Sequence, residues 1–107
     1  MAGTPITAFS VAGTVILLHG RAANVTDGTV FNTTAGQGYL QLFDVTAAAA
    51  VTLGTTPAYH FVPVSPGDND TIRSGNGFQF TKGIAVATTT TPTGATGATC
   101  HLTVIVE

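Results

Sequence analysis

At 107 residues the chain is long enough for one domain with a hydrophobic core, since a chain of this size hides roughly two-thirds of its unfolded surface on folding. Charged residues make up only 7% of the sequence, against about 25% in ordinary globular chains, and the net charge is −2. No basic stripe is present, which argues against nucleic acid as a partner, because phosphate backbones are held by several Lys or Arg side chains at once.

The N-terminal segment, MAGTPITAFSV, is expected to start as an extended arm over residues 1–7 and to contain a strand at 5–11. A second short β-branched strand, TVILLHG, is predicted at 14–20. Its apolar run from Val15 to Leu18 has no positive segment before it and is far shorter than the roughly 20 residues that a membrane span needs. We therefore expect neither a signal peptide nor a membrane anchor.

The middle of the chain predicts two more strands, YLQLFDV (39–45) and AYHFVPV (58–64). Between them, VTAAAAVTLG has four alanines but is too short to persist as a helix, so we expect a loop or a single turn. After the second strand, SPGDND could hold calcium through its two carboxylates. It lacks the glycine and glutamate that an EF-hand loop places at fixed positions, so a turn joining two strands is predicted at 65–70.

The C-terminal part predicts short strands at GFQF (77–80), GIAVAT (83–88) and CHLTVIVE (100–107). In the last strand Cys100 shares the core face with Leu102, Val104 and Val106, and as a single cysteine it predicts a buried thiol rather than a disulfide. Phe78 and Phe80 should both point inward. The predicted core comprises Leu40, Leu42, Phe61, Phe78, Phe80, Ile84, Val86, Leu102 and Val104.

Seven or eight short strands punctuated by Gly and Pro predict a single all-β domain over residues 1–107. The fold class we expect is an antiparallel β-sandwich with a jelly-roll-like arrangement. No segment shows a sustained helical period of apolar residues.

The sequence contains no clear catalytic or metal-binding motif. His19, His60 and His101 each fall in a predicted strand and could meet as metal ligands on one face, but their spacing does not require this, and we expect strand-surface histidines with local hydrogen bonds. The single glutamate, Glu107, is terminal, the serines lack the nucleophile-elbow glycines, and GQG and GNG lack the context of a phosphate loop. We predict no catalytic, metal or cofactor site, and no enzyme activity.

Residues 38–107 resemble a class of small virion proteins of tailed bacteriophages. The resemblance rests on YLQLFD, the connection GTTP, the turn SPG, and a phenylalanine leading into GIAVA and a neutral loop. It implies a β-sandwich subunit of the particle without catalysis, on either the capsid or the tail. The chain departs from that class in its last loop, where TTTTPTGATGATC stands in place of acidic residues.

The resemblance and the low charge together predict a capsid decoration (cement) protein, made in the host cytoplasm and placed on the capsid exterior. It would bind the major capsid protein, hold neighbouring capsomers together and form a homo-oligomer, for which we place a trimer before a dimer. One alternative is a tail- or fibre-associated adhesin or collar module. Another is a carbohydrate-binding β-sandwich, which the absence of Trp and the presence of only two Tyr disfavour.

The neutral stretch 75–99, in which Lys82 is the one charged residue, has two interpretations. It is either an ordinary mobile hairpin loop, or a loop that lies with the N-terminal arm against a neighbouring subunit without desolvating ions. If the arm and the loop make the particle contacts, we expect the sandwich to fold without residues 1–7 or without residues 88–99, because the predicted core lies outside both segments. The candidate interface residues are Ala2, Gly3, Thr4 and Pro5 of the arm and Thr90, Thr91, Pro92 and Thr93 of the loop.

Overall fold

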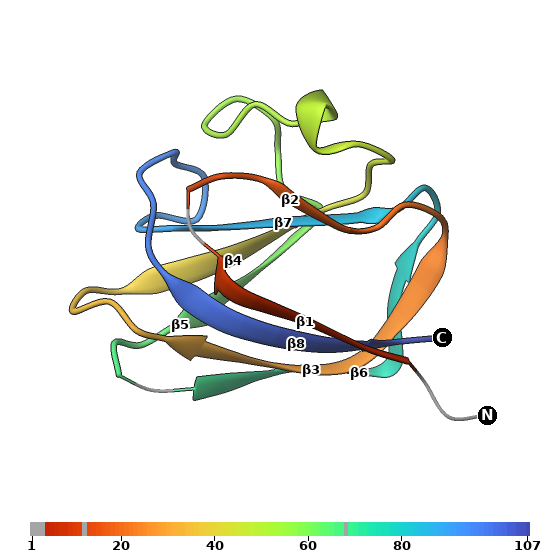
Figure 1. Ribbon diagram of the computed structural model, residues 1–107, viewed down its shortest axis with the longest axis horizontal. Coiled ribbons are helices and arrows are strands. Elements are labelled where there is room, and N and C mark those ends of the chain that lie inside the picture. Colours follow the sequence, from red (N-terminus) through yellow and green to blue (C-terminus); the bar gives the residue numbers. More distant parts are fainter. Residues whose placement is uncertain (1–3, 12, 68) are drawn as a thin grey trace.

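The described part of the chain forms eight β-strands and one turn of 3-10 helix. The computed structural model describes residues 4–11, 13–67 and 69–107 (Figure 1). The elements are β1 (Thr4–Val11), β2 (Ile16–His19), β3 (Ala23–Asn32), β4 (Gly38–Phe43), η1 (Ala48–Ala50), β5 (His60–Val64), β6 (Asn69–Phe80), β7 (Ile84–Thr89) and β8 (Cys100–Val106).

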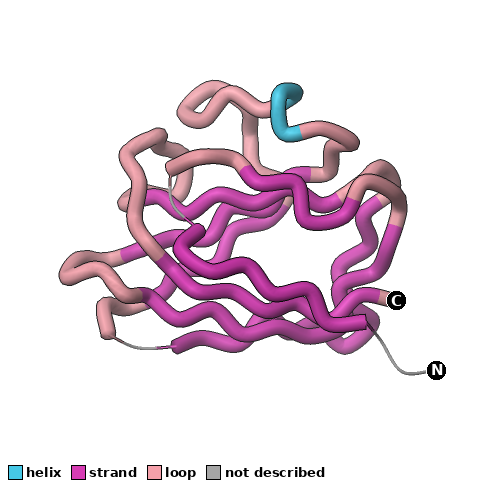
Figure 2. The backbone as a smooth tube through the Cα atoms, viewed as in Figure 1, coloured by secondary structure: helices cyan, strands magenta, loops and turns pink. Residues whose placement is uncertain are grey.

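The strands build two antiparallel sheets of four, which lie face to face as two layers (Figure 2). Sheet A has the order β1-β8-β3-β6 and sheet B the order β2-β7-β4-β5. Most consecutive strands alternate between the sheets, and the resulting order is that of an eight-stranded jelly roll. The predicted jelly-roll-like β-sandwich is confirmed.

The hydrophobic core fills the space between the two sheets. In β8 the residues Cys100, Leu102, Val104 and Val106 are buried, whereas His101 between them is exposed. This confirms the predicted faces of the last strand, because successive side chains of a strand point to opposite sides. The other predicted core residues that are buried are Leu40, Leu42, Phe80, Ile84 and Val86, and Phe78 is partly buried against them.

Phe61 was predicted in the core and lies on the surface, with 46% of its area exposed. In β5 the alternation instead turns Val62 and Val64 inward, so Phe61 and Pro63 face outward. The Phe61 ring contacts Tyr39 of β4 edge-on, with ring centroids 6.2 Å apart. The aromatic character of Phe61 therefore did not indicate that its side chain is buried. The face of β5 that packs on the core is the one that carries Val62 and Val64.

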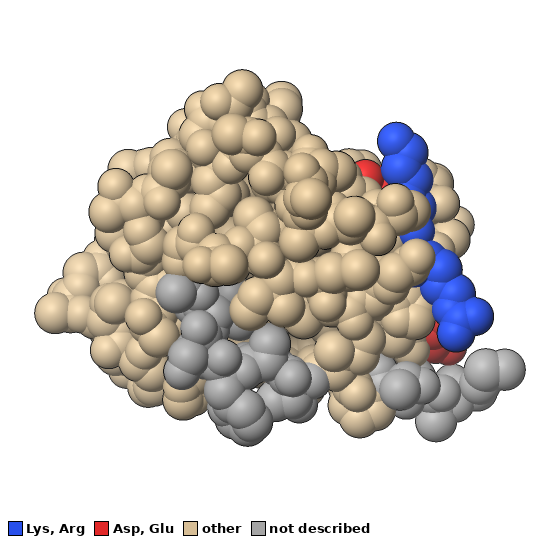
Figure 3. Space-filling view, turned by 45° about the horizontal axis from the view of Figure 1, so that its top comes forward, with Lys and Arg blue, Asp and Glu red and all other residues tan. Residues whose placement is uncertain are grey.

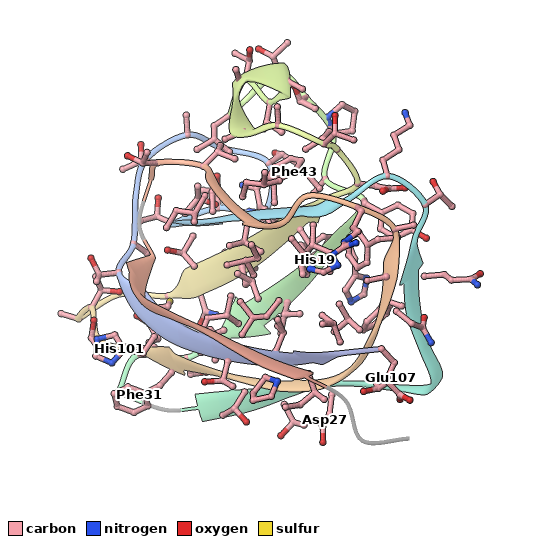
Figure 4. All side chains as sticks on the ribbon, turned by 45° about the vertical axis from the view of Figure 1, so that its right-hand side comes forward. His19, Asp27, Phe31, Phe43, His101 and Glu107 are labelled. Carbon is pink, nitrogen blue, oxygen red and sulfur yellow. The ribbon has the colours of Figure 1, made fainter. Side chains whose placement is uncertain are left out.

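A second, smaller apolar cluster lies on the outer face of sheet B. Phe43 and Ala85 of that sheet pack with Val51 of the connection 44–59, which passes over them (Figures 1 and 4). The connection contains η1 as its one helical turn, which agrees with the prediction for the alanine run. Burial of Val51 and its neighbours keeps this long connection on the sheet.

Strand β3 was not predicted. Its buried residues Val25, Gly28, Val30 and Asn32 do not follow a strict alternation, because the register to both neighbouring strands shifts between Val25 and Asp27. Strand β6 is also longer than the predicted 77–80. It starts at Asn69, so Asn69 and Asp70 belong to a strand rather than to the expected turn at 65–70.

The buried position of Cys100 makes its thiol a test of the strand faces. Burial raises the pKa of Cys100, and a hydrogen bond with the Thr88 side chain lowers it by less. The pKa of the thiol is therefore above its usual value, and little reactive thiolate forms near neutral pH. We expect alkylating reagents to leave the folded protein unmodified while they label the denatured protein fully. Cys100→Ser should lower the free energy of unfolding by about 1–3 kcal/mol. Rapid labelling of the folded protein would contradict the assignment of Cys100 to the core.

Candidate functional site

Four connections between strands meet at one end of the longest axis of the molecule (Figure 1). Because the strands are antiparallel, β1–β2, β3–β4, β5–β6 and β7–β8 all turn at this end. We call the described residues of these connections, 13–15, 33–37, 65–67 and 90–99, the loop end. The β2–β3 turn (20–22), the β6–β7 turn (81–83) and Glu107 lie at the other end, which we call the charged end.

The described connections at the two ends differ in their charged residues. No Asp, Glu, Lys or Arg occurs among these described loop-end residues. Asp68, which completes the β5–β6 connection in the sequence, lies outside the described residues, and Asp70 belongs to the start of β6 at the same end. Arg21, Lys82 and Glu107 are exposed at the charged end. Figure 3 shows the Lys and Arg side chains gathered along one edge, while the remaining described surface in that view is almost free of charge. The loop end therefore offers hydroxyl, amide and main-chain groups to a partner.

Asn32 fastens two connections of the loop end together from inside the fold. Its side chain is fully buried, and Nδ2 donates to the carbonyl oxygens of Gly36 (3.0 Å) and Val64 (2.9 Å). Its Oδ1 accepts from the backbone N–H of Thr34 (2.9 Å) and from the Thr34 hydroxyl. The main-chain N–H of Gly67 donates to the Asn32 carbonyl (3.0 Å). The β3–β4 and β5–β6 connections are thereby held in one arrangement.

Thr33 extends these links to the β7–β8 connection. Its N–H and its hydroxyl both donate to the Thr99 carbonyl, at 3.0 and 2.9 Å. Gly13 of the β1–β2 connection lies against Gly97, where a Cβ on Gly13 would be only 3.0 Å from the Gly97 Cα. Each of the four connections of the loop end is thus linked to at least one of the others.

Gln41 holds the β7–β8 connection on the outer face of sheet B. Its buried Nε2 donates to the Thr89 hydroxyl (2.7 Å) and to the Gly94 carbonyl (3.2 Å). Within the connection, the Thr90 N–H donates to the Thr96 carbonyl at 2.9 Å. These hydrogen bonds hold the connection on sheet B, which argues against the mobile hairpin loop that was one of the two interpretations of the sequence.

The anchoring also changes the expectation that residues 88–99 can be deleted without harm to the fold. Thr88, Thr89 and Ala98 are buried, and deletion of residues 88–99 would remove both acceptors of the Gln41 amide, the Thr89 hydroxyl and the Gly94 carbonyl. Substitutions at the exposed residues at the tip of this loop should therefore disturb the fold less than deletion of the whole segment.

The candidate interface residues fall at opposite ends of the molecule. Ala2 and Gly3 lie outside the described residues. Thr4 and Pro5 begin β1 at the charged end, where they pair with Val106 and Ile105.

The loop residues Thr90, Thr91 and Thr93 are exposed at the loop end, and Pro92 is half-buried. Strand β8, which separates this loop from Val106, spans about 20 Å. The structure therefore does not bring the two groups into one surface. It also places residues 4–7 in sheet A, so these four residues of the predicted arm are part of the sandwich.

The three histidines are separate, and no shared metal site forms from them. His19 ends β2, and His101 lies on the exposed outer face of sheet A, well apart from it (Figure 4). His60 packs its ring on Phe78 with centroids 4.3 Å apart, and burial lowers the pKa of His60. Among the described residues no group of three His, Cys, Asp or Glu side chains could hold a metal ion.

Asp44 has a structural role at the start of the long connection. Partial burial acts to raise its pKa, but hydrogen bonds donated by Lys82 N–H, the Thr81 hydroxyl and N–H, and Gly83 N–H outweigh burial and hold the pKa below its usual value. The carboxylate thus orders the β6–β7 turn.

Comparison with known proteins identifies no family. No protein-family model matches the sequence, and no curated protein matches it significantly. In the part of the chain that the structure describes, no helix is long and apolar enough to cross a membrane.

Some solved structures resemble this chain at low similarity. A crystal structure of PirA is 17% identical, with 97% of this chain and 94% of PirA covered and a TM-score of 0.44. The capsid asymmetric unit of cyanophage Pam1 is 18% identical, with 99% and 86% covered and a TM-score of 0.34. Hydroquinone 1,2-dioxygenase from Sphingomonas sp. TTNP3 is 15% identical, with 96% and 57% covered and a TM-score of 0.26. A phage capsid unit is thus among the structural neighbours, but at such scores these likenesses carry no argument about function.

Proposed function

We propose that this protein is a capsid decoration protein of a tailed bacteriophage, which binds the shell of major capsid protein and stabilises neighbouring capsomers. The observation that carries the proposal is the sparse charge of the chain, in which charged residues make up only 7% of the sequence. A solvated monomer normally keeps its neighbours away with interspersed charges, so a surface with so few is suited to being covered. The sequence resemblance over residues 38–107 supports a place in the phage particle, on either the capsid or the tail.

The proposed mechanism depends on many weak contacts that the symmetry of the particle repeats. Each subunit buries uncharged surface on the shell and on its neighbours in a homo-oligomer, for which we favour a trimer. Modest single interfaces then add up, because binding at one position raises the effective concentration for the next. No catalytic step, cofactor or metal takes part in this mechanism.

The proposal predicts binding to shells that is nearly independent of salt. We expect the purified protein to co-sediment with shells assembled without it, and to do so with an affinity that changes less than about twofold between low salt and about 0.5 M, because few exposed ion pairs can be screened. Phage tails serve as the control particle. Binding to tails but not to shells would favour the tail or fibre alternative, and a steep loss of shell binding with salt would contradict the uncharged interface.

A further inference from the structure

We propose that His60 makes the edge of the sandwich between β5 and β6 sensitive to acid, so that protonation of its imidazole loosens β5 from sheet A. This proposal does not depend on the decoration role. β5 is an edge strand of sheet B and β6 is an edge strand of sheet A. Contacts between side chains hold the two sheets together along this edge, which we call the β5–β6 seam.

Aromatic rings form the described contacts of the β5–β6 seam. The His60 ring lies against the Phe78 ring of β6, with centroids 4.3 Å apart and 31° between the ring planes. Tyr59 packs on Phe80 with ring centroids 5.0 Å apart, and its hydroxyl donates to the Gln79 carbonyl at 2.7 Å. Two consecutive residues of the β5 side therefore contact the last three residues of β6.

His60 occupies the inner side of β5. Val62 and Val64 of this strand are buried, and the alternation of side chains places His60 on the same side. Phe78 is itself partly buried against the core. The imidazole is half-buried, and none of the described residues accepts a hydrogen bond from it. A proton added to His60 would therefore place a charge at an apolar contact without a protein acceptor.

This position favours the neutral imidazole. Burial lowers the pKa of His60 from its ordinary value of 6.5, because the charged ring loses more hydration than the neutral ring. Attraction of a cation to the face of the Phe78 ring acts in the opposite direction and is modest. Since the pKa is lower in the folded protein than in the unfolded chain, the stabilisation is complete above pH 6.5 and decreases as the pH falls below it.

The described residues on the β4 side offer His60 no ionic partner. The residue of β4 that pairs with His60 is Leu42. Tyr39 of β4 contacts Phe61 on the outer face of sheet B. Asp44, the first residue after β4, already accepts hydrogen bonds from the β6–β7 turn.

The charged residues of β3 and β6 lie away from the β5–β6 seam. Asp27 of β3 is in register with Arg73 of β6 and with Ile105 of β8. This row belongs to the outer face of sheet A, because the neighbours of Ile105 in β8 are buried. Asp70 belongs to the start of β6, at the loop end, whereas the β5–β6 seam involves the last residues of that strand.

Arg21, Lys82 and Glu107 lie at the same end of the sandwich as His60, which is the charged end. All three are exposed, and they carry charges of both signs. Water and salt screen exposed charges of this kind. Burial against Phe78, rather than an ion pair, should therefore decide the protonation of His60.

The test follows the wild-type protein by NMR and by thermal unfolding between about pH 7.5 and about pH 5. We expect the His60 imidazole resonances to titrate with a midpoint below pH 6.5, and the Phe78 ring resonances to move with the same midpoint. The temperature of thermal unfolding should decrease over the same range. A His60 midpoint at or above pH 6.5, or Phe78 resonances that do not move, would overturn the proposal.

His60→Gln removes the titrating group and keeps a polar side chain. We expect this variant to lose at least about half of the wild-type decrease in unfolding temperature. His60→Phe should do the same, which guards against an effect of the amide itself. The control is His101→Gln on the outer face of sheet A, which should keep the wild-type decrease. If both His60 variants decrease as much as the wild type, the pH dependence arises elsewhere and the proposal is wrong.

Discussion

Asn32→Leu lowers the free energy of unfolding by about 3–5 kcal/mol. Leucine is close to asparagine in shape but has no polar atoms, so the buried acceptor Val64 O and the partly buried acceptor Gly36 O lose their donor, and Thr34 N–H loses its acceptor. Each buried polar group left without a partner costs about 1–3 kcal/mol. The measurement is the midpoint of urea unfolding of the two proteins.

The matched control for Asn32 is Gln37→Ala in the same connection. Gln37 is exposed, and its amide donates to the adjacent Gly38 carbonyl at 3.1 Å. Loss of this local bond should change the free energy of unfolding by less than about 0.5 kcal/mol. Equal stability of Asn32→Leu and the wild type would show that Asn32 does not hold the two connections together.

Gly83→Ala should destabilise the protein by about 3 kcal/mol or more. Gly83 is the last residue of the β6–β7 turn and is enclosed by two main-chain carbonyls. A Cβ at this position would lie 2.8 Å from the His19 oxygen and even closer to the Val45 oxygen. Neither oxygen can move without displacing the end of β2 or the start of the connection 44–59. For a chain of this size we expect the midpoint of thermal unfolding to fall by on the order of 10 °C.

Gly36→Ala is the control for Gly83. A Cβ on Gly36 meets nothing within 4 Å. This substitution should be neutral or slightly stabilising, by up to about 1 kcal/mol, because alanine restricts the unfolded chain. A small effect of Gly83→Ala, comparable with that of Gly36→Ala, would mean that the junction of β2, β4 and β7 yields readily.

Local patterning was enough to predict most of the strands and their faces. In β8 the alternation from Cys100 to Val106 is strict, so the core face could be identified from the sequence. In β3 the register shift after Val25 interrupts the alternation, and the segment was overlooked. Phe61 was misplaced because aromatic character indicates a strand without indicating which of its faces is buried.

The candidate site could be predicted only in part. The exposure of Thr90, Thr91 and Thr93 agrees with their choice as interface residues, although no observation tests that role. Asn32 and Gln41 were missed, because a buried amide looks like any other polar residue until its partners are known. Asn32 belongs to an Asn-Thr-Thr triplet, which indicates at most a surface motif.

The sequence by itself determined the poverty of charge, the β character and the face of the most regular strand, since these depend on residue types and on neighbours a few positions apart. Only the tertiary structure decided that four connections meet at one end and that Thr4 and Pro5 lie at the other. The order of the strands in the two sheets determines which connections and which chain segments lie at each end. The links that hold the loop end together, such as Thr33 to Thr99, join residues far apart in the chain. Their partners are therefore defined by packing between the sheets rather than by local sequence.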